Sequence, residues 1–358
     1  MNKNLKDFSI LLFRSVFFWI FACFLLIVIR YYGIGEEEGR TIRENYEVPI
    51  TEWFDILLYA GALLGLLYAL VEFFLEKIIN NKFSLGFILL IKLVIYLVAL
   101  ILVTTLTTFY FEHRMDIDLP NNQGWWQTSK VFWVSVLYFF MSSLVFSFLK
   151  IASDNFGSGV FANMLLGKYR KPIEEERIFM FLDLKDSTTI AEKLGHFLYS
   201  EFIQDCFLDL NRIVNKYDAQ VYQYVGDEAV LTWKFKKGIY KFNCVTLFFD
   251  FKSQLQKREL YYIKKYNYFP EFKAGLHGGK LMVAEVGTVK KELAFHGDVV
   301  NTAARIQGQC NKLDATLLIS EDLLLPLNLN LNYVVKEVGA LELKGKQVKI
   351  NVFTINKV

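Results

Sequence analysis

Four apolar stretches of bilayer length fill most of the first part of the chain. They cover about residues 8–29, 53–75, 84–110 and 131–149, and each is long enough to cross a membrane as a helix. No small-residue cleavage site follows the first stretch, so we interpret it as an anchor and not as a removed signal peptide. The pattern predicts a membrane domain of four transmembrane helices over residues 1–149.

After residue 176 the pattern changes to short apolar runs separated by amphipathic stretches. It predicts a strand at 177–184, a helix to about 217, a hairpin at 219–233, a helix near 239–266, two strands within 272–287 divided at Gly278 and Gly279, and a helix over 298–312. This βαββαβ order is that of the ferredoxin-like fold. The predicted fold class is therefore α+β, with the membrane helices followed by a ferredoxin-like domain over residues 177–358.

A linker is predicted between these two domains, over residues 150–176. It contains Gly157, Gly159 and Gly167, and Pro172 prevents one helix from continuing into the first strand. The linker is the covalent route by which a signal would pass from the membrane to the second domain. Its alternative role is that of a spacer.

Charges around the spans predict the orientation of the membrane domain. Segment 31–52 carries the run EEE (36–38) and has Arg40 and Arg43 as its basic residues. The opposite ends of the spans are flanked by Lys3, Lys6, Lys77, Lys82, Lys150, Lys168, Arg170 and Lys171. The positive-inside rule therefore predicts a multi-pass protein of the cell membrane, in contact with the lipid bilayer, with both termini in the cytoplasm. A net charge of +3 is too small to indicate nucleic-acid binding.

Two opposite charges lie inside the spans, Glu72 and Lys92, and an antiparallel helix pair would place them at similar depth. A paired charge, with a functional role, is one interpretation. Snorkelling of both side chains to the cytosolic interface is the other, and we favour it from the sequence. Arg14 lies near enough to the end of its span to snorkel as well.

Cysteine and histidine spacing gives no metal site. Cys23, Cys206, Cys244 and Cys310 lack paired or metal-ligand spacing and are predicted to be core thiols. His277 and His296 each stand alone beside glycines and are predicted to be structural. Tyr222 and Tyr224 follow a period of two and are predicted to pack on the faces of a sheet.

Two aspartates, Asp183 and Asp227, each end a short apolar strand where packing gives no reason for a carboxylate. Asp183 lies in FLDLKDSTT (181–189). Asp227 lies in YQYVGDEAVLTW (222–233), which reads as a strand, a Gly-Asp turn and a returning strand. The predicted sheet places the two residues on adjacent central strands. Because Mg²⁺ is usually held by one or two carboxylates plus phosphate oxygens, the pair predicts a divalent-metal site that acts on a nucleotide.

Two further segments complete a family pattern. HGDVVNTAARI (296–306) predicts a helix with Asn301 and Arg305 four residues apart on one face, and LELKGK predicts a strand that ends in Lys346. The type, spacing and order of these segments resemble the catalytic domain of class III nucleotidyl cyclases, the adenylate and guanylate cyclases. The resemblance covers roughly residues 177–356.

The resemblance implies a two-metal mechanism in a homodimer. Asp183, Asp227 and the backbone carbonyl of Leu184 would hold two Mg²⁺ or Mn²⁺ ions, and backbone amides after Leu184 would face phosphate. Asn301 and Arg305 would donate to the α-phosphate. Lys346 would donate to the terminal phosphates. In this family the donors come from the opposite subunit, so the resemblance implies that one chain alone has no complete site.

Three positions depart from the usual pattern of the family. Gln223 stands where adenylate cyclases usually have a base-reading lysine and guanylate cyclases a glutamate, and Ala294 stands where a second base-reading side chain is expected. Asp186 stands where glycine is frequent, and we expect it to cap the following helix and point away from the triphosphate. We predict that Gln223 and Ala294 line the substrate site and that ATP is preferred over GTP.

The predicted protein is thus a membrane-anchored adenylate cyclase that forms 3′,5′-cyclic AMP and pyrophosphate. Guanylate cyclase is the nearest alternative. A catalytically inactive dimerising signalling module is another alternative. Such a module has no physical need to keep all five of the residues Asp183, Asp227, Asn301, Arg305 and Lys346. A diguanylate cyclase has a related fold, but the Asn301 and Arg305 helix and the terminal LKGK fit it poorly.

Overall fold

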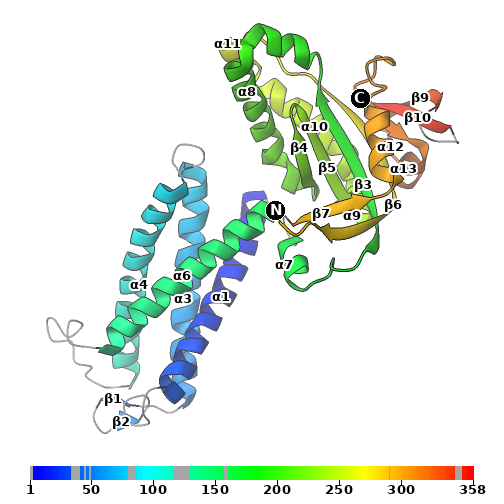
Figure 1. Cartoon of the computed structure of the whole chain (residues 1–358). Helices are drawn as coiled ribbons and strands as arrows, with labels where there is room; N and C mark the ends of the chain where they lie inside the picture. The colour runs from blue at the N-terminus through cyan, green and yellow to red at the C-terminus, as the bar shows by residue number, and fades with distance from the viewer. Residues whose placement is uncertain are drawn as a thin grey trace. The chain divides into compact units, whose positions relative to one another are not determined.

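A computed structural model describes the chain except for residues 1–2, 34–40, 44–45, 48–49, 80–84, 116–129, 157–159, 290 and 343–348. The chain forms two compact units, Met1–Ala152 and Ser153–Val358. The first is the membrane unit and the second is the C-terminal unit (Figure 1).

The membrane unit is built from long apolar helices. They are α1 (Lys3–Gly33), α3 (Ile50–Ile79), α4 (Leu85–Met115) and α6 (Lys130–Phe156), with a short pair of strands, β1 (Thr41–Arg43) and β2 (Tyr46–Glu47), after α1. Each helix contains a segment that is long and apolar enough to cross a membrane, namely Phe8–Ile29, Phe54–Leu75, Gly86–Thr107 and Trp133–Ser153. The four predicted apolar helices are confirmed.

Helices α1 and α3 approach each other closely at two glycines. A Cβ atom on Gly61 would lie 2.8 Å from Cα of Ile20, and one on Gly65 would lie 2.4 Å from Cα of Val16. Two glycines four residues apart form the small-residue spacing that lets membrane helices pack backbone to backbone. Larger residues at either glycine would push α1 and α3 apart.

Glu72 of α3 is fully buried inside the membrane unit and is paired there. Its Oε2 accepts from Nζ of Lys92 at 2.7 Å and from Nζ of Lys150 at 2.5 Å, while Oε1 accepts from the hydroxyl of Tyr96. These contacts join α3, α4 and α6. The favoured prediction of snorkelling was therefore wrong for Glu72 and Lys92, because two ammonium groups and a phenol satisfy the carboxylate without solvent.

The C-terminal unit contains one large mixed sheet. Its strands are β3 (Ile173–Leu184), β4 (Gln220–Val225), β5 (Glu228–Lys234), β6 (Phe272–Val286), β7 (Glu292–His296), β8 (Leu317–Ser320), β9 (Tyr333–Leu341) and β10 (Ile350–Lys357). Their order is β4-β5-β3-β6-β8-β10-β9, and β7 pairs with β6 beside that path. Strands β4, β5, β3 and β6 pair antiparallel with one another and give the ferredoxin-like order, so that prediction is confirmed. Strand β8 pairs parallel to β6.

Helices cover both faces of this sheet (Figure 1). The helical segments are α7 (Val160–Leu165), α8 (Ser187–Val214), α9 (Phe235–Ile239), α10 (Asn243–Lys257), α11 (Glu259–Tyr266), α12 (Asp298–Gln307) and α13 (Glu321–Leu327), with short 3-10 turns at Asn215–Tyr217 and Tyr240–Phe242. Successive side chains of β3 point to opposite faces of the sheet. Ile178, Met180 and Leu182 enter the core formed with α8 and α10. Phe179 and Phe181 enter the core formed with α12.

Three predicted elements differ from the structure. Residues 272–287 do not divide at Gly278 and Gly279, because β6 runs without a break and pairs with β3 through both glycines. The single helix predicted near 239–266 is broken at Arg258 into α10 and α11. The helix predicted over 298–312 ends at Gln307, where Gly308 follows.

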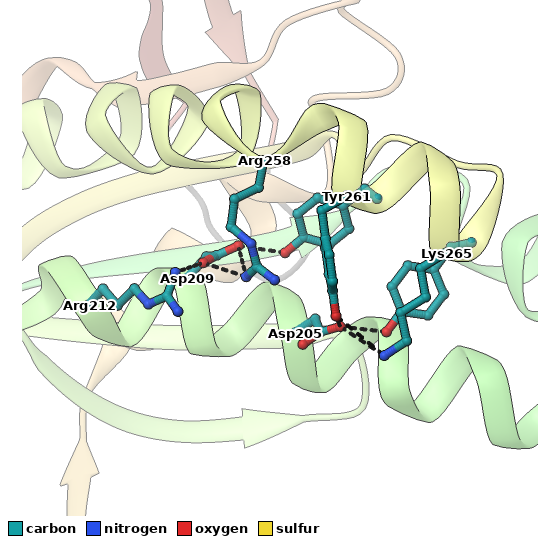
Figure 2. Close-up of polar contacts among 8 residues, drawn as sticks. Asp205, Asp209, Arg212, Arg258, Tyr261 and Lys265 are labelled. Atoms are coloured by element: carbon teal, nitrogen blue, oxygen red, sulfur yellow. Dashed lines mark hydrogen bonds and ion pairs between the residues drawn. The ribbon is translucent and has the colours of Figure 1, made fainter. Parts of the chain in front are cut away.

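Arg258, at the break between α10 and α11, binds a buried aspartate of α8 (Figure 2). Its guanidinium donates to both carboxylate oxygens of Asp209, at 2.8 and 2.7 Å, and Tyr262 and Arg212 donate to the same carboxylate. Asp209 is 1% exposed. The cluster thus ties α11 to α8 by a fully compensated charge.

The structural predictions for the cysteines, His277 and Tyr222 also hold. All four cysteines are buried and free. His277 is buried with its Nδ1 2.7 Å from the hydroxyl of Ser320. Tyr222 packs its ring against Phe179 and Phe295.

Candidate active site

Asp183 lies on the face of β3 that α12 covers. Phe179 and Phe181 point to this face and pack with Val299 of α12, and Asp183 is the next residue in the same alternation. It is half-buried, whereas its neighbour Leu184 is buried in the opposite core. A carboxylate therefore follows two aromatic residues at the end of a buried strand, as the sequence predicts.

The turn between β4 and β5 brings two more carboxylates to the same end of the sheet. Gly226 has a φ of +60°, in the region that favours glycine, and Asp227 follows it. Glu228 begins β5 and is paired with Asp183 in the β3–β5 register. Three acidic residues thus lie near one another where β3 ends and β5 begins.

Burial and mutual repulsion perturb this acidic group. Burial, and then the charge of Asp227, raises the pKa of Asp183 above its usual value. Burial, followed by the charges of Asp183 and Asp227, raises the pKa of Glu228 to about 7. Burial and then Asp227 also raise the pKa of Tyr199 on α8. Like charges held together disfavour ionisation, so the site carries more negative charge than its surroundings balance.

The protein offsets the charge of Asp183 only in part. Nε2 of Gln307 donates to Oδ2 of Asp183 at 3.0 Å, and the backbone N–H of Leu184 also hydrogen-bonds the carboxylate. Lys273 faces Asp183 across the β3–β6 register, but its ammonium donates to Asn311. Among the described residues, no lysine or arginine forms an ion pair with Asp183, Asp227 or Glu228.

This unbalanced charge fits a divalent cation. Across the described ranges, no group of three or more His, Cys, Asp or Glu side chains is arranged to hold a metal by itself. Mg²⁺ does not need such a group, because one or two carboxylates bind it together with water and substrate phosphates. Asp183, Asp227 and the carbonyl of Leu184 are residues of the right kind for an ion that arrives with a nucleotide.

Helix α12 carries the two predicted phosphate donors. Asn301 is exposed and Arg305 is half-buried, one turn apart on the helix. Asn301 lies about 9 Å along the helix axis from Gln307, the residue that contacts Asp183. No hydrogen bond or ion pair between described residues joins Asn301 or Arg305 to the carboxylates of the same chain.

The predicted base-reading positions lie on two different strands. Gln223 is exposed on β4, beside a bulge after Val221, and pairs with Val230. Ala294 is half-buried on β7 and pairs with Ala284 of β6. Lys346 lies outside the described residues.

The prediction for Asp186 was wrong. Asp186 occupies the position before α8, but its side chain makes no capping hydrogen bond and its φ is 56°. This left-handed conformation favours glycine and is tolerated by aspartate. The backbone therefore explains why glycine suits this position.

Sequence reasoning missed three residues of the site. The sequence could have indicated Glu228, because two adjacent acidic residues follow Gly226 in the predicted turn. Tyr199 had no signal beyond its place on an amphipathic helix. Gln307 lies 124 positions from Asp183, and only the packing of α12 on the sheet brings the two together.

Comparisons with known proteins match the region that contains these residues to a known family. The profile of the adenylate and guanylate cyclase catalytic domain matches residues 170–357. A stretch of 199 residues is 36% identical to adenylate cyclase 2 of Rhizobium meliloti (strain 1021) and covers 56% of this chain. The match spans about half of that relative, 55% of its length.

Solved structures of cyclases resemble part of this chain. A bacterial light-regulated adenylyl cyclase gives a TM-score of 0.53 at 19% identity, covering 64% of this chain and 66% of the other. The adenylyl cyclase CyaB from P. aeruginosa gives 0.47 at 16% identity, covering 52% and 97%. The first likeness shows a shared fold. Because the family profile matches more than half of the residues, the chain belongs to the family of the adenylate and guanylate cyclase catalytic domain.

Proposed function

We propose that the protein is a membrane-anchored adenylate cyclase that converts ATP to 3′,5′-cyclic AMP and pyrophosphate. One observation carries the proposal. Three acidic residues lie near one another where β3 ends and β5 begins, without an ion-pair partner among the described residues, in a domain of the cyclase family. A site of that charge attracts Mg²⁺ or Mn²⁺ with the triphosphate that it carries.

The proposed roles divide between the two ends of the substrate. Asp183, Asp227 and the carbonyl of Leu184 would hold two divalent ions, which supply Lewis-acid activation of the ribose 3′-hydroxyl and neutralise phosphate oxygens. Asn301 and Arg305 would donate to the α-phosphate as negative charge builds up on it. Lys346 would bind the terminal phosphates and stabilise the pyrophosphate as it leaves.

The active form is proposed to be a homodimer. Within the described part of the chain, no hydrogen bond or ion pair joins Asn301 or Arg305 to the carboxylates of the site. This finding supports donation to the site of a second copy. If a chain with Asp183→Ala is mixed with a chain with Asn301→Ala, random pairing gives mixed dimers with one intact site of two. Activity should then recover to roughly a quarter of wild type.

Nucleotide choice is proposed to rest on Gln223. Its amide meets the N1 acceptor and the N6 donor of adenine, but it cannot also accept from the 2-amino group of guanine while it serves N1 and O6. Ala294 adds no polar contact. ATP should therefore be preferred over GTP, and Gln223→Glu should shift the ratio of kcat/KM toward GTP, because a carboxylate accepts from both N1–H and the 2-amino group. An unchanged ratio would exclude Gln223 as the base-reading residue.

The membrane unit is proposed to hold the catalytic unit at the cytoplasmic face of the cell membrane. The four long apolar helices support membrane insertion, and the distribution of lysine and arginine supports cytoplasmic termini. Fusing a reporter to residue 1 and to residue 358 in turn would test this orientation. A reporter found outside the cytoplasm at either end would contradict it.

The decisive test of the activity is product identification. Full-length protein in detergent or nanodiscs is incubated with ATP or GTP and Mn²⁺, and the products are separated and identified by mass. We expect cyclic AMP as the main product and none from the Asp227→Ala variant. Cyclic GMP as the main product would establish a guanylate cyclase, and no product from either nucleotide would favour an inactive dimerising module.

A further inference from the structure

Gln307 contacts the candidate metal site from the helix that carries the phosphate donors. Its Nε2 donates to Oδ2 of Asp183 at 3.0 Å, and it is the last residue of α12. The same helix begins at Asp298 and carries Asn301 and Arg305 before Gln307. One short helix therefore carries donors with two different roles. Gln307 donates to the metal ligand of its own chain, whereas Asn301 and Arg305 are the proposed donors to the other site.

The position of Gln307 is fixed by a close contact between backbones. A Cβ atom on Gly275 of β6 would lie 2.3 Å from the backbone N of Gln307 and 2.6 Å from its Cα. Gly275 pairs with Phe181 on β3, two residues before Asp183. Only a residue without a side chain allows the end of α12 to reach the sheet here, so the amide of Gln307 is delivered to Asp183 by a rigid contact.

The chemistry of Gln307 suits a carboxylate that must stay charged. A lysine at this position would pair with Asp183 and compete with a cation, and a glutamate would add a fourth negative charge. A neutral amide donates to one carboxylate oxygen and leaves the negative charge of Asp183 unneutralised. Hydrogen bonds of this kind to metal-binding carboxylates orient them for the metal.

We propose that Gln307 is a positioning residue: it orients the Asp183 carboxylate for metal binding and couples that metal site to the α12 helix whose Asn301 and Arg305 serve the partner site. The inference rests on the proposed cyclase function and on the proposed dimer. It predicts that the metal affinity of each site depends on the α12 of its own chain, while the donors of that α12 act in the other site. A displacement of one α12 would therefore affect both sites of the dimer.

The first test measures metal binding without nucleotide turnover. Gln307→Met keeps the length and helix propensity of the side chain but removes its donor. Gln309→Met is the matched control, because the side-chain amide of Gln309 makes no hydrogen bond within the described part of the chain. Binding of Mn²⁺ to the full-length protein is followed by electron paramagnetic resonance, with thermal unfolding to show that both variants are folded.

We expect Gln307→Met to weaken Mn²⁺ binding by about tenfold or more, as is typical when a partner of a metal-binding residue is lost, and Gln309→Met to leave it unchanged. In turnover assays the Mn²⁺ concentration for half-maximal rate should rise by a similar factor, with a smaller change in kcat at saturating metal. Equal Mn²⁺ affinities of Gln307→Met and wild type would overturn the inference. If Gln307→Met does not fold, Gln307→Ala is measured against Gln309→Ala with the same criteria.

The second test locates the effect within the dimer. In a mixed dimer, one chain carries Asn301→Ala and supplies the intact metal site, and the other carries Asp183→Asn and supplies the donors. Adding Gln307→Met to the first chain should raise the Mn²⁺ requirement of the single intact site, whereas adding it to the second chain should not. An equal rise from both placements would overturn the assignment to the chain's own Asp183 and indicate a general structural role of α12.

Failure of the inference is distinct from failure of the proposed function. If the mixed dimer without Gln307→Met is inactive, the shared site itself is wrong, and with it the coupling between sites. If that dimer is active and Gln307→Met leaves the Mn²⁺ requirement unchanged in either chain, the cyclase proposal stands and the role of Gln307 is overturned.

Discussion

Glu72 in the membrane unit and Asp183 in the C-terminal unit are both acidic residues withdrawn from solvent, but their surroundings differ in kind. Glu72 is fully buried and receives the ammonium groups of Lys92 and Lys150 together with the hydroxyl of Tyr96. Asp183 receives a neutral amide from Gln307 and lies beside two further acidic residues. The protein neutralises the charge of Glu72 and leaves that of Asp183 unbalanced.

A buried carboxylate that its own chain neutralises holds elements together, whereas a group of carboxylates that is not neutralised attracts a cation from outside. Asp209 belongs with Glu72, since Arg258, Arg212 and Tyr262 surround it (Figure 2). The difference separates structural acids from functional acids without reference to sequence conservation. Four predictions test it, from the largest expected effect to the smallest.

Replacing Asp227 with Asn should abolish cyclase activity, by about a thousandfold or more, because metal-dependent stabilisation of charge in phosphoryl transfer is worth several kcal/mol. Its folding should not suffer. Without metal the variant should unfold at the same temperature as wild type or higher, since repulsion on Asp183 and Glu228 is relieved. Cyclic nucleotide production and thermal unfolding in EDTA measure the two effects.

The matched control is Asp218→Asn, which changes an aspartate that lies two residues before β4 and pairs with Lys237 near the surface. We expect full activity from it. Strong destabilisation by Asp227→Asn in EDTA would contradict the interpretation of Asp227 as an open charge.

Replacing Asp209 with Asn should have the opposite pattern and lower the free energy of unfolding of the C-terminal unit by about 3 kcal/mol, because it leaves the guanidinium of Arg258 without its charge partner. Hydrogen exchange in peptides from α8 and α11 of the full-length protein measures this loss. Cyclase activity per folded molecule should be retained. Arg212→Gln is the control, with an expected loss near 0.5 kcal/mol, because Arg212 is 62% exposed.

In the membrane unit, replacing Glu72 with Gln should destabilise the helix bundle by about 2 kcal/mol, because two lysines then lack a counter-charge away from water. Thermal unfolding of the full-length protein in detergent measures it. Lys92→Met should cost less, since Lys150 still neutralises Glu72. Unchanged stability in Glu72→Gln would return both residues to the snorkelling interpretation.

The smallest expected effect is a pH dependence without metal. The pKa of Glu228 is raised from an ordinary value of 4.5 to about 7 by burial and by Asp183 and Asp227. The folded state therefore holds more protons than the unfolded state between these values. This contribution to stability is present below the lower pKa and is lost as the pH rises through the higher one.

Asp205 should show the reverse dependence. Burial raises its pKa, but hydrogen bonds from Tyr266 and Tyr261 outweigh burial and hold the pKa below its usual value of 3.8. Its stabilisation is lost as the pH falls through that range.

The raised pKa of Glu228 predicts that the unfolding temperature in EDTA declines from about pH 5 to about pH 7. Glu228→Gln should reduce this decline. Saturating Mn²⁺ should abolish it, and a decline that persists with metal would argue against metal at this group.

Much of the architecture followed from local pattern. The apolar helices, the strand before Asp183, the hairpin at Asp227 and the helix with Asn301 and Arg305 were all predicted, because hydrophobic period and turn residues report local structure directly. The errors lay where tertiary contacts overrule local signals. Gly278 and Gly279 do not break β6, because β3 pairs with both residues. Arg258 ends α10, and its guanidinium binds Asp209 on α8 at that point.

The sequence by itself predicted which residues would carry chemistry and on which elements the described ones lie, because a carboxylate at the end of a buried strand is visible in the order of residues. The tertiary structure decided which charges remain open. The pairing of Glu72 with Lys92 and Lys150, and that of Asp183 with Gln307, joins residues 20, 78 and 124 positions apart. Charge interactions act over a few ångströms in space, so only the packed chain shows which carboxylate is neutralised and which is free to bind a metal.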